Sequence, residues 1–249
     1  MCGIAGLYHL ETAKPVDDAR VRAMLTPMGH RGPDGSGIWT APGVGLGHLR
    51  LAIVDLDGSP QPMASDDEAC VISYNGEIYN FRALRAELES RGHRFRTAGD
   101  TEVILAAWRQ WGVDCLSHLN GMFAFAIHDH RRGCLFMARD RMGVKPLHYA
   151  RLSDGAVAFA SELKGLLRCP QLRVDADFRA VEDYFALGYV PDDACIVAGV
   201  RKLPAGHYLM LERGKPMPQP VQWWSVDFSR RTRASEADCA DHLYHMMQQ

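Results

Sequence analysis

Cys2 is the residue whose place in the chain could supply chemistry by itself. It follows the initiator Met1, so removal of Met1 would leave a cysteine with both a thiol and a free α-amino group. A thiolate is a strong nucleophile, and an α-amino group with an ordinary pKa of about 7.7–8.0 is a base at neutral pH. One residue would then hold nucleophile and base together. The alternative is a small buried apolar side chain near the terminus.

Arg50 and Asp100 could bind the two charges of an amino acid backbone. Arg50 lies in the stretch HLRL at 48–51, where a buried guanidinium would need an anionic partner. A guanidinium matches a carboxylate with two parallel hydrogen bonds, although Arg50 could also end a strand in solvent. Asp100 lies at the predicted start of a helix. It could accept a substrate ammonium group there, or it could only cap the helix.

Asn75 and Gly76 are a third candidate feature, within YNGEIYN at 74–80. The Asn75 side-chain amide and the Gly76 backbone N–H could donate to one oxygen on which negative charge develops. Loss of one donor from such an oxyanion hole typically lowers a rate by about 10²–10³. Asn-Gly is also a common turn sequence, so a turn between a strand and a helix is the alternative.

Two further segments carry weaker signals. HRGPDGSG at 30–37 has three glycines and a proline, which predict a loop. That loop would be a surface turn or a mobile lid beside a substrate. HDH at 128–130 could suggest a metal, but no further ligands are in view, and a turn between two strands is the interpretation we adopt. We therefore predict no metal site.

The composition is that of an ordinary globular protein and excludes several classes. The chain has 249 residues, 47% hydrophobic and 23% charged, with a net charge of −2. Nucleic-acid binding through a basic face is not expected. The longest apolar run, at 121–127, is too short for a membrane span, and we expect no signal peptide before Cys2. Seven cysteines without a CxxC pair predict a cytoplasmic protein without a disulfide framework.

The elements that position these residues are short strands and paired helices, which indicate an α+β layered fold. Strands are predicted at 3–8, 45–54, 69–74, 122–127, 134–138, 147–151 and 156–160. Helices are predicted at 81–91, 102–111, 162–168 and 178–186. Their predicted caps are Asn80, Asp100 or Thr101, and Ser161. Prolines at 216, 218 and 220 predict an extended linker, and Ser235 with Asp238 opens a helix that runs to the chain end.

Eight segments occur in an order that resembles a known family: MCGIAG, HRGPDGSG, HLRL, YNGEIYN, GDTEVI, NGMFAFAI, ARDRMGVKPLHY and ASELKGLL. Together they resemble the class II glutamine amidotransferase domain, an N-terminal-nucleophile hydrolase. Within that family, the chain resembles the glutaminase half of glutamine-hydrolysing asparagine synthetases. DYFALGYVP at 183–191 and KLPAGH at 202–207 further resemble asparagine-synthetase-like proteins of bacterial exopolysaccharide and exosortase-linked clusters.

The resemblance implies a role for each matching residue: Cys2 as nucleophile, Arg50 for the glutamine α-carboxylate, Asn75 and Gly76 as oxyanion hole, Glu77 in the glutamine pocket, and Asp100 for the α-ammonium group. It implies a four-layer αββα sandwich, and L-glutamine as ligand without a cofactor for its hydrolysis. The chain departs from the pattern at Ala52, where relatives commonly have serine.

The resemblance also implies how the chain is organised. Residues 2–213 would form the glutaminase domain, and 214–249 a linker with the start of an ATP-dependent synthetase domain. The SGGxDS pyrophosphate loop of that domain is absent from the sequence. ATP and Mg²⁺ would act there, where ammonia reaches an activated carboxylate, aspartate in the case of asparagine synthesis. Members of the family often form homodimers.

Three other functions were weighed against this one. An amidase for penicillins or bile salts would leave Arg50 and Asp100 without a task, because those substrates lack paired amino acid charges. A glutaminase that serves a different acceptor, for example in exopolysaccharide biosynthesis, would keep all the site residues. A scaffold without catalysis would have no need of Cys2, Arg50, Asn75 and Asp100 together.

Overall fold

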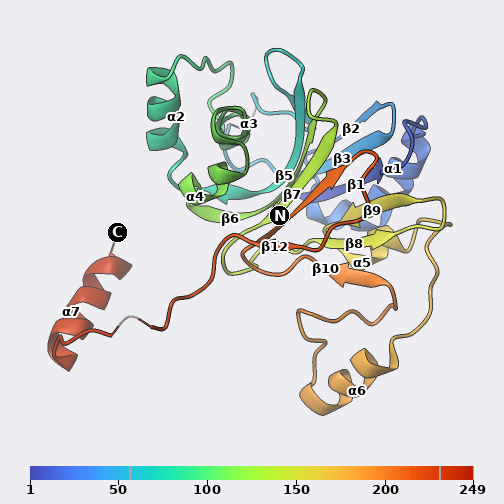
Figure 1. Cartoon of the computed structure of the whole chain (residues 1–249). Helices are drawn as coiled ribbons and strands as arrows, with labels where there is room; N and C mark the ends of the chain where they lie inside the picture. The colour runs from blue at the N-terminus through green and yellow to red at the C-terminus, as the bar shows by residue number, and fades with distance from the viewer. Residues whose placement is uncertain (56–57, 230, 249) are drawn as a thin grey trace.

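A computed structural model describes residues 1–55, 58–229 and 231–248 of the chain (Figure 1). Two six-stranded antiparallel sheets form its centre. The first sheet has the order β10 (Val200–Lys202), β8 (His148–Arg151), β9 (Ala156–Ala160), β1 (Gly3–His9), β3 (Val44–Arg50) and β2 (Gly35–Ala41). The second has the order β12 (Val221–Gln222), β11 (His207–Glu212), β7 (Cys134–Arg139), β6 (Gly121–Asp129), β5 (Cys70–Ile78) and β4 (Met63–Ala64).

Helices cover the outer faces of the sheets and continue the chain beyond them. The α-helices are α1 (Asp18–Leu25), α2 (Phe81–Ser90), α3 (Asp100–Trp111), α4 (Cys115–His118), α5 (Leu163–Leu166), α6 (Phe178–Leu187) and α7 (Glu236–Met247). Two 3₁₀ helices are η1 (Thr26–Arg31) and η2 (Gly112–Asp114). Figure 1 shows α2 and α3 on one side of the paired sheets, with α1 and α5 on the other.

Three apolar clusters establish the order of the layers. One lies between the sheets and takes side chains from both, such as Ile4 of β1 and Ala124 of β6. A second joins the second sheet to α2 and α3 and includes the fully buried Trp108. The third joins the first sheet to α1 and α5 through Met24 and Leu166. The predicted α+β fold, a four-layer αββα sandwich, is confirmed.

The strand predicted at 45–54 ends at Arg50, because the strands beside it end there. Leu49 pairs with Gly3, the first residue of β1, and Arg50 pairs with Gly35, the first residue of β2. The chain after Arg50 has no strand to pair with. It turns away instead and lines a pocket.

The strand predicted at 69–74 continues to Ile78, so Asn75 and Gly76 lie within β5 and not in a turn. A Cβ atom on Gly76 would lie 2.2 Å from the carbonyl oxygen of Met122 in the neighbouring β6. Glycine is required here for the close approach of two backbones, which the Asn-Gly pattern does not distinguish from a turn.

The predicted caps of α3 and α5 are wrong, whereas Asn80 lies at the predicted cap position of α2. α3 begins at Asp100, and its cap residue is Gly99. The Asn80 side chain makes no capping bond to α2 and instead bonds to the backbone of the segment before β6. The Ser161 hydroxyl accepts a hydrogen bond from the backbone N–H of Ile4 and does not cap α5. The side chains of Asp100, Asn80 and Ser161 each bond to a backbone group distant in sequence. Rules for helix caps consider only local partners and therefore miss these bonds.

The predicted loop at 30–37 is mostly regular structure. His30 and Arg31 end η1, and β2 begins at Gly35. The sequence analysis predicted neither α1 nor β2. The turn predicted at 128–130 lies at 130–133, with Gly133 at a φ of +59°, because β6 continues to Asp129. Among the described residues, no group of three or more His, Cys, Asp or Glu could hold a metal ion.

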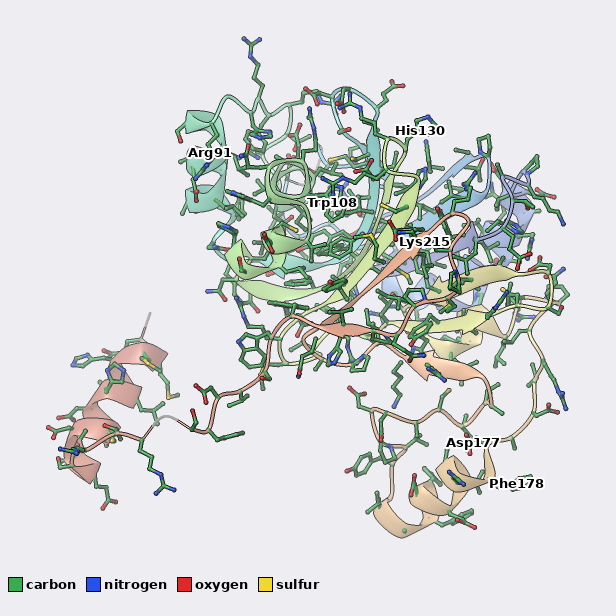
Figure 2. The ribbon with its side chains drawn as sticks, viewed as in Figure 1. Arg91, Trp108, His130, Asp177, Phe178 and Lys215 are labelled. Carbon is green, nitrogen blue, oxygen red and sulfur yellow. The ribbon has the colours of Figure 1, made fainter. Side chains whose placement is uncertain are left out.

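α6 and α7 are the least buried helices of the described chain. α6 begins after Asp177 and ends at Gly188, as predicted, but buries only Ala180. Figure 2 shows Phe178 at the start of α6, away from the two sheets. α7 has the predicted capping box of Ser235 and Asp238 and buries no residue. In the described ranges, no helix has the length and apolar character that crossing a bilayer requires.

We expect Gly76→Ala to destabilise the protein by about 1–3 kcal/mol, because the added Cβ must push β6 away from β5. The change is measured by urea unfolding. Gly29→Ala is the matched control, since a Cβ at this exposed glycine meets no atom within 4 Å. The control should stay within about 0.5 kcal/mol of the wild type. Equal stability of the two variants would show that the strands can separate without cost.

Candidate active site

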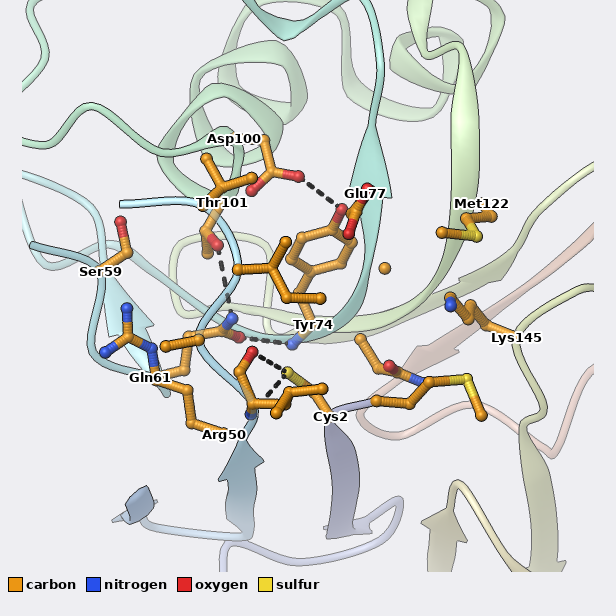
Figure 3. A pocket seen from close by; sticks show the side chains of 17 residues that line it. Cys2, Arg50, Ser59, Gln61, Tyr74, Glu77, Asp100, Thr101, Met122 and Lys145 are labelled. Atoms are coloured by element: carbon orange, nitrogen blue, oxygen red, sulfur yellow. Dashed lines mark hydrogen bonds between the residues drawn. The ribbon is translucent and has the colours of Figure 1, made fainter. Parts of the chain in front are cut away.

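A pocket of about 170 Å³ lies where β1, β3 and β5 meet, and Figure 3 draws the side chains that line it. All six residues predicted to form a site line this pocket: Cys2, Arg50, Asn75, Gly76, Glu77 and Asp100. Cys2 precedes β1, Arg50 ends β3, and Asp100 begins α3. Asn75, Gly76 and Glu77 lie on β5. Four elements, β1 and β3 of one sheet, β5 of the other, and α3, therefore bring distant parts of the chain to one cavity.

The Cys2 thiol lies against the chain that leaves β3. The Leu51 N–H donates to the Cys2 sulfur at 3.3 Å, and the thiol lies 3.5 Å from the Leu51 carbonyl oxygen. Burial raises the pKa of the Cys2 thiol, an effect that the Leu51 N–H, the charged chain terminus and the nearby Arg50 and Arg31 only partly oppose. The thiol therefore depends on a base to become a nucleophile at neutral pH.

The Asn75 side chain is nearly inaccessible, with 1% of its surface exposed. Its Nδ2 atom has no hydrogen-bond partner among the residues that the structure describes. A buried donor without a partner costs about 1–3 kcal/mol, so such groups are uncommon outside functional sites. Asn75 lines the same pocket as Cys2, and its amide is therefore a donor available to a ligand there.

The Gly76 N–H points to the same edge of β5 as the N–H groups of Tyr74 and Ile78, because strand backbone alternates with a period of two. The Tyr74 N–H donates to Gln61 Oε1 at 2.7 Å. The Ile78 N–H donates to Asp100 Oδ2 at 3.0 Å. Both acceptors lie on the side of β5 that is turned away from β6. The Gly76 N–H lies between them and faces the pocket.

Arg50 is held by the segment that follows it. Its Nη2 donates to the Asp55 carbonyl oxygen at 2.7 Å. The Asp55 carboxylate accepts hydrogen bonds from the Ser59 hydroxyl at 2.7 Å and the Ala98 N–H at 3.1 Å. The Ser59 hydroxyl is the main cause that holds the pKa of Asp55 below its ordinary value. The guanidinium therefore has a fixed position at the pocket wall.

Asp100 is a buried carboxylate, 7% exposed. Its Oδ2 atom accepts hydrogen bonds from the Tyr74 hydroxyl at 2.7 Å and from the Ile78 N–H. Burial raises the pKa of Asp100 although these hydrogen bonds lower it. A cation in the pocket would restore the charge that burial disfavours. Figure 3 shows Glu77 at the same end of the pocket as Asp100.

Five polar residues of the pocket were not predicted as site residues: Ser59, Gln61, Tyr74, Thr101 and Lys145. Tyr74 lies in the motif YNGEIYN and Lys145 in ARDRMGVKPLHY. The resemblance therefore included both residues but predicted no role for either. Lys145 is 5% exposed and reaches the pocket from the segment after β7, on the side of Met122 (Figure 3). Gln61 has no such signal, because it lies in an irregular segment and is recognisable only by its bond to β5.

The chain is similar to known proteins over most of its length. A family model described as a glutamine amidotransferase domain matches residues 1–224. The chain is 37% identical over 236 residues to asparagine synthetase [glutamine-hydrolyzing] 3 of Bacillus subtilis, covering 93% of this chain and 38% of that protein. It is 38% identical over 180 residues to asparagine synthetase B of Escherichia coli, covering 72% of this chain and 32% of that protein. The chain thus spans about a third of these relatives.

Solved structures share the fold. The glutamine phosphoribosylpyrophosphate amidotransferase of B. subtilis superimposes with a TM-score of 0.65 at 20% identity, over 90% of this chain and 50% of that one. A structure described as the allosteric regulatory enzyme of purine biosynthesis gives a TM-score of 0.66 at 20% identity, over 92% and 50%. These likenesses concern the fold alone. The family match covers most of the sequence, and on that ground the chain belongs to the glutamine amidotransferase domain family.

Proposed function

We propose that the chain hydrolyses L-glutamine to glutamate and ammonia through a γ-glutamyl thioester on Cys2. The observation that carries this proposal is the buried Nδ2 of Asn75, which has no partner within the described part of the chain; Asn75 lines the same pocket as Cys2. An unpaired donor beside a nucleophile suits a reaction in which negative charge develops on a carbonyl oxygen. Membership of the glutamine amidotransferase family supports the choice of glutamine.

The proposed reaction is acyl transfer in two stages. The α-amino group of Cys2, free once Met1 is removed, accepts the thiol proton, and the thiolate attacks the amide carbon of glutamine. Asn75 and the Gly76 N–H donate to the tetrahedral oxyanion. The protonated amine gives its proton to the departing nitrogen, which leaves as ammonia. Water then cleaves the thioester to glutamate and regenerates the thiol.

The charged residues of the pocket would select an α-amino acid. Arg50 would bind the α-carboxylate, since its guanidinium is held at the wall by Asp55. Asp100 would receive the α-ammonium group, and Glu77 would line the same end of the pocket. Penicillins and bile salts carry no such pair of charges, so an amidase for those substrates would leave Arg50 and Asp100 unused.

We further propose that the ammonia serves a synthetase reaction in a longer protein. The matched relatives are named glutamine-hydrolysing asparagine synthetases, and the chain spans about a third of them. ATP and Mg²⁺ would act only in the acceptor half-reaction, giving asparagine from aspartate. A different acceptor in exopolysaccharide biosynthesis would leave the glutaminase chemistry unchanged. The exposed apolar side chains of α7, including Leu243, Tyr244 and Met247, are suited to contact such a further domain.

We also propose that the protein works in a reducing compartment, the cytoplasm, and forms a homodimer, as the family resemblance implies. The seven free cysteines support the first proposal, because five of them are buried and an oxidising compartment would favour paired thiols. Size-exclusion chromatography of the protein would test the second.

Cys2→Ala should abolish glutamine hydrolysis, because the nucleophile is removed. Glutamate release is measured by a coupled assay, with the buried Cys115→Ala as control for a cysteine remote from the pocket. Intact-mass analysis of the wild type would show whether Met1 has been removed. A molecule that keeps Met1 should be inactive. Full activity of Cys2→Ala would overturn the proposed function.

Asn75→Ala should lower kcat by about 10²–10³ with little change in KM, since the amide donates to charge that develops in the transition state. Asn80→Ala is the control, because Asn80 holds the backbone before β6 and does not line the pocket. The control should lose stability only. A rise in KM with unchanged kcat in Asn75→Ala would assign this amide to substrate binding and not to the oxyanion.

Glutamine binding should weaken as pH falls through the pKa of Asp100, because a protonated carboxyl no longer attracts the ammonium group. Burial raises the pKa of Asp100, so the rise in KM should begin at a higher pH than the ordinary value of about 3.9 would give. KM is measured from neutral to acidic pH. In Asp100→Asn, KM should be high at every pH and lack this rise. The same rise in Asp100→Asn would mean that another group causes it.

A further inference from the structure

Two of the motifs that identified the family take no part in the chemistry described above: HRGPDGSG and ASELKGLL. The structure brings them together at the start of the chain. We propose that Arg31 and Glu162 are positioning residues that fix the backbone of Cys2, and that Ser161 fixes the neighbouring Ile4. The effect on rate rests on the proposed glutaminase function, whereas the effect on the backbone does not.

The proposed nucleophile lies at the N-terminus, where residues are usually poorly ordered. The pairing of β1 with β3 begins at Gly3, so Cys2 lies outside the ladder of strand hydrogen bonds. After removal of Met1, Cys2 would be held by only one chain neighbour. Terminal residues are poorly ordered unless other contacts tie them down. Attack on a carbonyl carbon requires a defined sulfur position, and an error of about 1 Å can cost about 10²-fold in rate.

Arg31 supplies the missing contact. Its Nε donates to the Cys2 carbonyl oxygen at 2.8 Å, and its Nη1 donates to Glu162 Oε1 at 2.8 Å. The Arg31 side chain is 7% exposed, which makes its two bonds part of the protein interior. Charge-assisted hydrogen bonds of this length are stronger than neutral ones. The carbonyl group of Cys2 is thus fixed by a side chain from η1.

Glu162 orients Arg31 and also contacts two further basic side chains. His30 Nε2 lies 3.0 Å from Glu162 Oε1, and Lys164 Nζ lies 2.9 Å from Oε2. Burial alone would raise the pKa of Glu162, but hydrogen bonds from Arg31, Lys164 and His30 hold it at about 2. Glu162 therefore stays ionised at neutral pH, and its hydrogen bond with Arg31 is charge-assisted there.

Ser161 holds the residue two positions after the nucleophile. Its N–H donates to the Ile4 carbonyl oxygen at 2.8 Å, and its hydroxyl accepts the Ile4 N–H at 2.9 Å. Ser161 is fully buried. It continues the pairing of β9 with β1 beyond Ala5 and Ala160, with its side chain in place of a backbone carbonyl. Ser161 therefore holds the backbone of Ile4 directly, and the adjacent Glu162 holds the backbone of Cys2 through Arg31.

The first test compares Glu162→Ala with Glu162→Gln in the full chain after removal of Met1. We expect kcat for glutamine to fall by about 10²-fold in Glu162→Ala, with KM nearly unchanged, because Arg31 loses its orientation and Cys2 loses its anchor. Glu162→Gln keeps an oxygen that can accept from Arg31 Nη1. It should recover part of the lost kcat.

Asp154→Ala is the matched control. It removes an ion pair with Arg20 of 3.0 Å, and the Asp154 side chain is 26% exposed against 23% for Glu162. Asp154 precedes β9 whereas Ser161 and Glu162 follow it, so the control lies at the opposite end of the same strand. It should keep wild-type kcat. Equal kcat in Glu162→Ala and Asp154→Ala, at equal thermal stability, would reduce Glu162 to a structural ion pair and overturn the proposal.

A second measurement needs no glutaminase activity. Amide hydrogen exchange over residues 3–8, read by mass spectrometry, should become faster in Glu162→Ala and Ser161→Ala than in Asp154→Ala. Protection equal to the control in both variants would overturn the anchoring role. If the wild type released no glutamate, the proposed function would fail, and this exchange measurement would still decide whether the N-terminal strand is held as proposed.

Discussion

The pairing of β1 between β3 and β9 is the constraint on which the site depends. All seven residues of β1 are buried, so the chain begins in the middle of a sheet and not at its edge. A terminus in that position can present a terminal side chain to a cavity only if both neighbouring strands leave room for it. β3 does so by ending at Arg50, and β9 does so by turning into α5 after Ser161. The pocket is therefore a gap in the first sheet, where β1 begins and where β3 and β9 end, and it is also lined by β5 of the second sheet.

Groups that disfavour folding are concentrated around this gap. The Asn75 amide and Arg31 Nη2 are buried without partners among the described residues, and burial disfavours the charged form of Asp100. The three apolar clusters that join the four layers offset these costs. Local departures from packing rules are expected at functional sites when the rest of the fold is consistent. The division of the molecule into a regular sandwich and an irregular pocket follows from that balance.

Much of the fold was predictable where sequence signals are local. β9 and the start of α2 were predicted to the residue, and the four layers followed from the family resemblance. The failures share one cause, which is that long-range partners decide local structure. Gly76 remains in a strand because β6 is close, and Ser161 leaves the helix cap because Ile4 competes for its hydroxyl. Five of the six site residues were candidates from their chemistry and position alone, and the family resemblance added Glu77. Gln61 lies in neither a motif nor a regular element, so it could not be found before the fold was known.

The three N–H groups along one edge of β5 have a further consequence for what the pocket can accept. Strand residues two apart are separated by about 6.6 Å, so Ile78, which holds Asp100, and Gly76 are a fixed distance apart. Under the proposed roles, that distance separates the group that receives the ammonium from the group that receives the reacting oxygen. Asparagine, one methylene shorter than glutamine, would not reach both. Discrimination between the two amides would then depend on the spacing along β5, which fixes how far Asp100 lies from the oxyanion donors.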